Sequence, residues 1–125
     1  MPAAETILLV DDSDALRAVL CEMLEGAGYR VLPARNGLEA LQISQTFPGR
    51  LDLVIADILM PLMDGLALAE KLRQKRPIRL LLMSGDPAAL GRASAQPPRG
   101  TLVLQKPFTQ DELLSTVREI LAAGR

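Results

Sequence analysis

The sequence predicts an α/β domain with a parallel sheet covered by helices on both faces. Short apolar runs, typical of buried strands, alternate with segments in which apolar residues recur at helical spacing. Three of the runs stop abruptly at polar residues, namely Asp11 and Asp12, Asp57, and Lys106. In a doubly wound sheet the carboxyl ends of the strands meet at one edge, so we expect these polar groups to share a site there.

The first half of the chain is expected to contain three strands and two helices. Short apolar runs predict strands at residues 7–10, 29–33 and 51–56. A helix is predicted over residues 14–27, with an inward apolar stripe of Leu16, Val19, Leu20, Met23, Leu24 and Ala27. Asn36 is expected to cap the second helix, which ends before Pro48.

The second half repeats this alternation. A loop rich in turn residues, 60–65, leads into a helix that closes before Pro77, with Asp64 as its cap or as a loop brace. Strands are predicted at residues 78–83 and 102–104, and a weak helix around residues 88–95 separates them. Thr109 and Glu112 have the spacing of a capping box, which predicts the start of the last helix.

Composition limits the class of protein. The 125 residues suit one domain, which we assign to residues 1–125, and 49% of them are apolar. The net charge of −1 gives no reason to expect nucleic acid as a partner, and no apolar run approaches the roughly 20 residues that span a membrane. A single cysteine, Cys21, excludes an internal disulfide and favours a cytoplasmic location.

The predicted edge site needs a positive partner, because crowded carboxylates resist ionisation unless a cation joins them. An all-oxygen cluster in a chain without histidine favours a hard divalent ion such as Mg2+. With Asp12 and Asp57 on the ion, Asp57 can accept a phosphoryl group if Lys106 and Ser84 neutralise its equatorial oxygens. The alternative is that each aspartate only caps a helix or ends a strand.

Together the motifs resemble the receiver domain of bacterial two-component response regulators. They lie at residues 7–12, 57–65, 83–85 and 106–108, so the resemblance covers nearly the whole chain. It implies a flavodoxin-like fold, in which five helices surround a five-stranded parallel sheet of order 2-1-3-4-5. It also implies a phosphorelay switch that promotes its own phosphorylation and slow dephosphorylation, and that is not a turnover enzyme.

The resemblance implies a role for each residue of the predicted site. Asp57 would be the phosphoryl acceptor, and a phosphohistidine on a sensor histidine kinase or a histidine phosphotransfer protein would be the donor. Asp12, Asp57 and the backbone carbonyl of Leu59 would bind Mg2+ or Mn2+, and Asp11 would act through water. Ser84 would hydrogen-bond the phosphoryl group.

Lys106 would pair with the phosphoryl group, and a cis peptide between Lys106 and Pro107 would aim it inward. The sequence departs from the family at Val103, where receivers usually carry an aromatic ring whose rotamer follows phosphorylation. The missing ring and the weak fourth helix argue against a dimerising, DNA-controlling output. We therefore expect a monomer or weak dimer without direct nucleic-acid or membrane contact, similar to receivers fused to sensor histidine kinases.

Two further features concern the surroundings of the site. Leu59 is apolar where a polar side chain would help to orient an attacking water, so we expect it to shield Asp57 and to lengthen the phosphorylated state. The outer side of the first helix carries small residues, which predicts either a surface for a phosphohistidine-bearing helix or an ordinary exposed face. The residues of this predicted surface are Asp14, Ala15, Ala18, Cys21 and Glu22, with Phe108 nearby.

Other functions remain open at this point. The main alternative is a Mg2+-dependent phosphohydrolase with an aspartate nucleophile, although such enzymes have one residue between nucleophile and acid on one loop, whereas Asp11 and Asp12 are adjacent. Flavin or nucleotide binding is a third class, but Asp11 and Asp12 would repel phosphates. The basic residues between Lys71 and Arg79 indicate either a nucleic-acid surface or a solvated helix end.

Overall fold

The computed structural model describes residues 4–95 and 101–123, and the other residues of the predicted domain lie outside this description. The strands are β1 (Thr6–Val10), β2 (Arg30–Ala34), β3 (Leu53–Asp57), β4 (Leu80–Ser84) and β5 (Thr101–Gln105). The helices are α1 (Asp14–Gly26), α2 (Gly37–Thr46), α3 (Gly65–Lys75), α4 (Pro87–Ala95) and α5 (Gln110–Ala123). The predicted alternation of strands and helices is confirmed.

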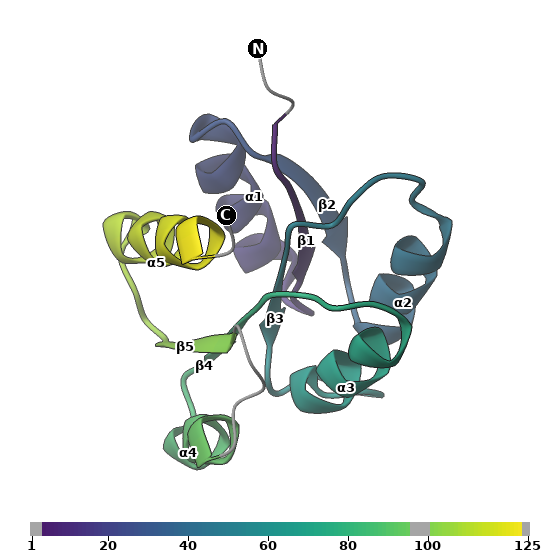
Figure 1. Ribbon diagram of the computed structural model, residues 1–125. Helices are drawn as coiled ribbons and strands as arrows, with labels where there is room; N and C mark the ends of the chain where they lie inside the picture. The colour runs from purple at the N-terminus through teal and green to yellow at the C-terminus, as the bar shows by residue number, and fades with distance from the viewer. Residues whose placement is uncertain (1–3, 96–100, 124–125) are drawn as a thin grey trace.

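The five strands are parallel and form one sheet in the order β2-β1-β3-β4-β5, as predicted. Helices α1 and α5 cover one face of the sheet, and α2, α3 and α4 cover the other (Figure 1). This order brings the carboxyl ends of β1 and β3 next to each other, with β4 and β5 following. None of the described helices is long and apolar enough to cross a membrane.

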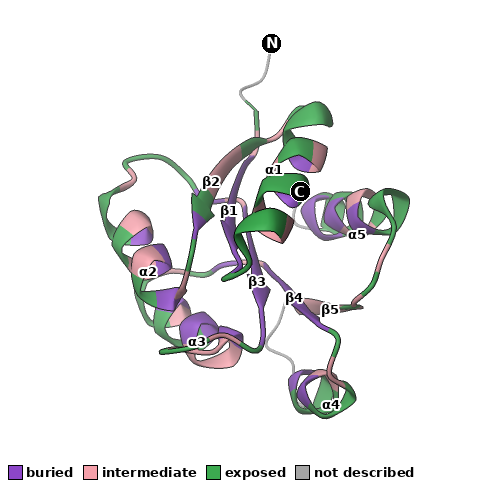
Figure 2. Ribbon diagram, turned by 180° about the vertical axis from the view of Figure 1, so that it is seen from behind, coloured by how far each residue is buried: buried purple, intermediate pink, exposed green. Residues whose placement is uncertain are grey.

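The core lies on both faces of the three central strands, which are buried along their whole length (Figure 2). Side chains alternate between the two faces with the period of a strand. Leu8, Val54 and Leu82 pack toward α2, α3 and α4, whereas Ile7, Ile55 and Leu81 pack toward α1 and α5. Burial on both faces explains why these strands read as continuous apolar runs.

Side-chain caps fix the start of four helices. The amide of Glu39 donates to Asn36 Oδ1 at 2.8 Å, and the amide of Ala67 donates to Asp64 Oδ1 at 2.8 Å. Thr109 and Glu112 form the predicted reciprocal capping box, with distances of 3.0 and 3.2 Å. These three predicted caps are confirmed, and Ser13 adds an unpredicted cap on α1.

The inward stripe predicted for α1 is wrong at two positions, and the predicted outer side is wrong at one. Val19 has 44% of its surface exposed and Ala27 is also exposed, although both were assigned to the core. Cys21, which we expected on the outer side, is half-buried against the α1–α5 core, and this burial, followed by the charge of Glu25, raises the pKa of its thiol. The physical reason is that the helix contacts the sheet mainly along one i, i+4, i+8 line, Leu16, Leu20 and Leu24.

Candidate functional site

The carboxyl edge of the sheet collects polar residues from four strands. β1 is followed by Asp11 and Asp12, β3 ends at Asp57, β4 ends at Ser84, and β5 is followed by Lys106. Parallel pairing aligns these ends, because β3 and β4 pair along their length and the Ser84 carbonyl accepts a 2.9 Å hydrogen bond from the Lys106 amide. The fold therefore gathers residues that are distant in sequence at one edge.

The acidic part of this edge consists of three carboxylates. One oxygen from each of Asp11, Asp12 and Asp57 lies within 4.8 Å of the others. Asp11 and Asp57 are buried and Asp12 is exposed. Lys106, which follows β5 at the same edge, places its Nζ atom 2.9 Å from Asp57 Oδ2 and 3.4 Å from Asp11 Oδ2. One ammonium thus serves two buried carboxylates.

Burial and charge act differently on Asp57 and Lys106. Burial raises the pKa of Asp57, which the hydrogen bond and charge of Lys106 oppose and the charge of Asp11 reinforces. A hydrogen bond from the backbone of Leu59 also favours the charged form of Asp57. Burial alone would lower the pKa of Lys106, but its contacts with the two carboxylates outweigh burial and raise that pKa. In formal charge, the three carboxylates of the cluster outnumber its one ammonium group.

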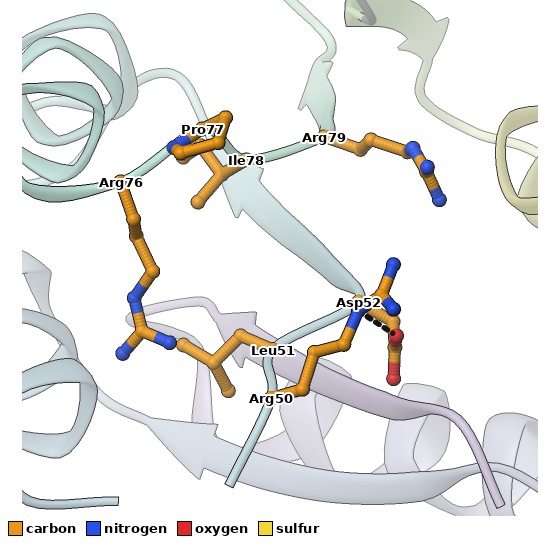
Figure 3. A pocket seen from close by; sticks show the side chains of 7 residues that line it. All are labelled: Arg50, Leu51, Asp52, Arg76, Pro77, Ile78 and Arg79. Carbon is orange, nitrogen blue, oxygen red and sulfur yellow. Dashed lines mark ion pairs between the residues drawn. The ribbon is translucent and has the colours of Figure 1, made fainter. Parts of the chain in front are cut away.

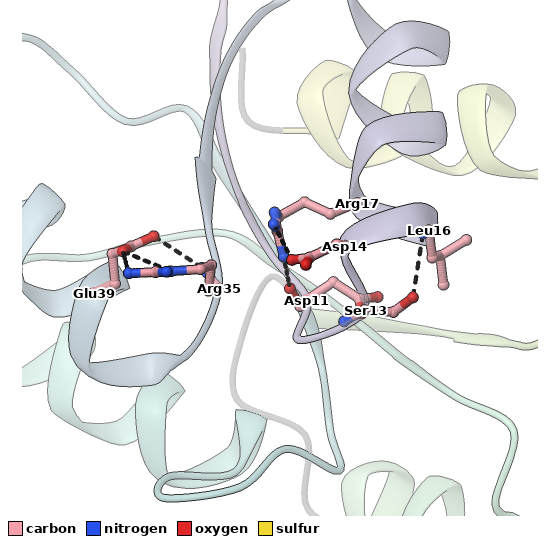
Figure 4. A network of polar contacts seen from close by, with 7 residues as sticks. All are labelled: Asp11, Ser13, Asp14, Leu16, Arg17, Arg35 and Glu39. Carbon is pink, nitrogen blue, oxygen red and sulfur yellow. Dashed lines mark hydrogen bonds and ion pairs between the residues drawn. The ribbon is translucent and has the colours of Figure 1, made fainter.

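A hydrogen-bond network holds the loop between β1 and α1 (Figure 4). Ser13 N–H donates to Asp11 Oδ1 at 2.8 Å, and the Arg17 guanidinium donates to the Asp11 carbonyl at 2.8 Å. Arg17 also pairs with Asp14 at 2.5 Å, and only 16% of its side chain is exposed. Arg17 was not predicted as a site residue. The sequence signal for Arg17 was its i, i+3 spacing from Asp14, which can form an ion pair on a helix.

The donor set fits a hard divalent cation. All three side chains offer carboxylate oxygens, which suit Mg2+. Within the described residues, the Asp12 carboxylate has no hydrogen-bond or ion-pair partner, whereas Asp11 is held by Ser13 and Lys106. Asp12 is thus available to a cation, and Asp57 faces the same space.

The remaining predicted site residues surround the cluster. Ser84 is buried, and its Oγ atom accepts a hydrogen bond from the Asp86 amide at 3.0 Å. The Lys106–Pro107 peptide bond is cis. Leu59 has 45% of its surface exposed, and Val103 is half-buried against the core that α2, α3 and α4 cover.

The predicted partner-facing residues divide into two groups. Asp14, Ala15, Ala18 and Glu22 are exposed on α1, whereas Cys21 and Phe108 are half-buried.

The chain is similar to one family along most of its length. The family model described as response regulator receiver domain matches residues 7–118. The sensor kinase CckA of Brucella abortus (strain 2308) is 37% identical over 124 residues, which are 97% of this chain but 13% of that kinase. The response regulator receiver protein CpdR of the same organism is 34% identical over 119 residues, covering 94% of this chain and 98% of that protein.

Solved structures agree with this similarity. The receiver domain of the hybrid histidine kinase CckA superimposes with a TM-score of 0.77 at 34% identity, covering 93% of this chain and 98% of that domain. The chemotaxis protein CheY4 of Vibrio cholerae gives a TM-score of 0.78 at 33% identity, covering 95% of this chain and all of that one. The chain is therefore comparable with a separate receiver protein and with one module of a long kinase.

Proposed function

Because the chain belongs to the response regulator receiver domain family and is a phosphoryl-accepting switch of two-component systems, we propose that Asp57 is its phosphoryl acceptor. The observation that carries this proposal is the contact of Asp57 with Lys106, 2.9 Å, inside an acidic cluster. Asp57 is the one member of the cluster that ends a central strand and also contacts the ammonium. Its neighbours therefore suit an incoming phosphoryl group.

The surrounding residues divide the work of charge neutralisation. When bound by Asp12, Asp57 and the Leu59 carbonyl, Mg2+ or Mn2+ would supply positive charge to the oxygens of the transferring group. Lys106 would keep its contact with the phosphorylated side chain, and the Ser84 hydroxyl would turn from Asp86 to donate to it. Asp11 would position Lys106 and act on the cation through water.

We propose a sensor histidine kinase or a histidine phosphotransfer protein as the donor and the cytoplasm as the place of transfer. The exposed part of α1, at Ala15 and Ala18, lies beside the acidic edge and would receive the helix that carries the phosphohistidine. The domain would act as a switch and not as a turnover enzyme. Since Val103 carries no ring, the response would be read from movement of the Ser84 and Lys106 loops.

Intact mass after treatment with a small phosphodonor tests the proposal. Wild-type protein should gain one phosphoryl group in Mg2+ and none in EDTA, and Asp57→Asn should gain none in either. Phosphorylation of Asp57→Asn would move the acceptor elsewhere. Repeated release of phosphate from small esters by the wild type, lost in Asp57→Asn, would instead indicate the Mg2+-dependent phosphohydrolase.

Leu59 allows a separate prediction about the lifetime of the phosphorylated state. Its backbone is hydrogen-bonded to Asp57, and its side chain is apolar and half-exposed at the rim. We expect Leu59→Asn to lose its phosphoryl group faster, by about ten-fold, because an amide can orient an attacking water. Loss of radiolabel measures this rate, and Leu59→Ala controls for removal of the shield alone. Equal rates in Leu59→Asn and the wild type would contradict the prediction.

A further inference from the structure

A cavity lined by basic side chains lies at the amino edge of the sheet, opposite the acidic cluster (Figure 3). Its volume is about 390 Å3, within the range of small-molecule sites. The loops that lead into β3 and β4 form it, together with the end of α3. Its wall carries Arg50, Arg76 and Arg79 around the apolar side chains of Leu51 and Ile78.

The charges that face this cavity are unbalanced. The wall of the cavity includes three guanidinium groups and one carboxylate, that of Asp52. Both oxygens of Asp52 are engaged, because Oδ1 lies 3.0 Å from Arg50 Nε and Oδ2 accepts a 2.7 Å hydrogen bond from the Thr6 amide. The carboxylate is therefore held against the wall, and Arg50 and Arg76 alone outnumber it in charge.

Two of the arginines keep donors for a ligand. Arg76 donates to the carbonyl of Ser44 at 2.6 Å, a neutral partner, and no carboxylate of the described residues lies within ion-pair distance of it. Arg50 meets Asp52 through Nε, and 76% of its side chain is exposed. Arg79 adds a third guanidinium to the wall and also makes contacts of its own. Arg50 and Arg76 thus carry the argument.

The neighbouring surface also carries arginine side chains. A second cavity of about 500 Å3 shares Arg50 and Asp52 with the first and adds Arg30, Phe47 and Glu5. The Arg30 guanidinium lies 5.1 Å from the centre of the Phe47 ring. Across both cavities, four arginines face two carboxylates. The positive excess therefore extends along the amino edge.

We propose that the cavity formed by Arg50, Arg76 and Arg79 binds a small organic anion that carries a phosphate group. Guanidinium groups present paired donors that match phosphate oxygens, so Arg50 and Arg76 would hold the phosphate. Leu51 and Ile78 would contact the apolar part of the ligand. This site would give a role to Arg76 and Arg79, two of the basic residues between Lys71 and Arg79. It is independent of the chemistry at Asp57.

Phenylphosphonate is a suitable probe, because it joins a ring to a doubly charged phosphonate and cannot transfer that group. It is titrated into the full chain carrying Asp57→Asn, in EDTA, and amide shifts are followed by NMR. We expect saturable shifts at residues 50–52 and at residues 76, 78 and 79, and weaker binding of inorganic phosphate and of benzyl alcohol. In that background, Arg76→Gln and Arg50→Gln should each weaken binding about ten-fold or more.

Arg35→Gln is the matched control. It removes the same charge from an exposed side chain that follows β2, at the opposite edge of the sheet, and should leave binding unchanged. Shifts that do not saturate, shifts at other residues, or an equal loss in Arg35→Gln would overturn the proposal. Because Arg50 is largely exposed, Arg50→Gln remains informative even if Arg76→Gln impairs folding.

Discussion

Asp57 is a buried carboxylate that shares one ammonium with Asp11, and this position opposes its ionisation. A carboxyl group whose pKa is raised by folding holds its proton more tightly in the folded chain than in the unfolded one. It therefore favours folding at low pH, and that contribution is lost as pH rises through the raised pKa. The proposed phosphoryl acceptor thus weakens the fold at neutral pH.

The stability of Asp57→Asn should report this cost. In the absence of divalent cations we expect the variant to be more stable than the wild type at neutral pH. The difference should shrink as pH falls through the raised pKa of Asp57 toward the usual carboxyl value of 3.8, because the wild-type side chain then becomes neutral as well. Urea unfolding midpoints across this pH range measure it. A difference that stays constant with pH would show that ionisation of Asp57 is not its cause.

Arg17 acts on the site through the backbone of Asp11. Replacing it with Met removes a charged hydrogen bond to the Asp11 carbonyl and should weaken binding of a divalent cation by about ten-fold. Mn2+ binding followed by electron paramagnetic resonance measures this without phosphorylation, and Arg17→Lys should restore part of it. Arg35→Met is the control, since Arg35 pairs with Glu39 on the surface. Equal Mn2+ affinity in Arg17→Met would assign Arg17 to helix stability alone.

At the scale of the elements, the start of α3 lies very close to the backbone of Asp57. Gly65 donates its N–H to the Ile58 carbonyl at 2.8 Å, directly after Asp57. A Cβ atom on Gly65 would lie 2.5 Å from the Asp57 carbonyl oxygen and 3.0 Å from Ile58 Cα, which are backbone atoms that cannot rotate away. The helix can therefore approach β3 this closely only with glycine at this position.

Gly65→Ala should destabilise the fold by about 1–3 kcal/mol and slow phosphorylation, because the backbone of Asp57 must shift. Gly91→Ala is its counterpart within α4, where no atom lies within 4 Å of the added Cβ. That variant should stabilise the fold by about 0.5–1 kcal/mol, since alanine favours helix interiors. Chemical denaturation measures both. Similar effects of the two substitutions would mean that the close approach of α3 is unimportant.

Local chemistry explains which element boundaries could be predicted from sequence. Asn36, Asp64 and Thr109 mark helix starts because their side chains bond the free amides of the first turn, which needs only neighbouring residues. The start of β3 could not be placed this way. Leu51 is apolar, yet the strand begins later because the Thr6 amide bonds the Asp52 side chain. Such a contact depends on a distant strand.

At the scale of the molecule, the two edges of the sheet carry opposite charge. Carboxylates gather where the strands end, and arginines gather where β3 and β4 begin. The acidic edge could be predicted, because parallel strands place their ends together whatever their spacing in sequence. The place of Arg76 in the basic cavity could not, because Arg76 caps the end of α3 and its position depends on how that helix packs.

The exposed part of α1 is the surface that we propose for docking of the partner. Ala18 is exposed on the helix that follows the acidic loop, and Val19 and Met23 line a groove of about 380 Å3 between α1 and α5. An arginine at position 18 would fill the space that a partner helix needs while leaving Asp57 untouched. Ala18→Arg should therefore slow transfer from a phosphohistidine protein by about ten-fold or more.

Phosphorylation of Ala18→Arg by a small phosphodonor should remain at the wild-type rate, since that reaction needs no docking surface. Ala122→Arg provides a matched control, because Ala122 is an exposed alanine in the last turn of α5. That helix begins at the carboxyl edge of the sheet, and Ala122 lies at its other end. Unchanged transfer in Ala18→Arg would remove α1 as the docking surface. Slower reaction with both donors would instead place the effect at Asp57 itself.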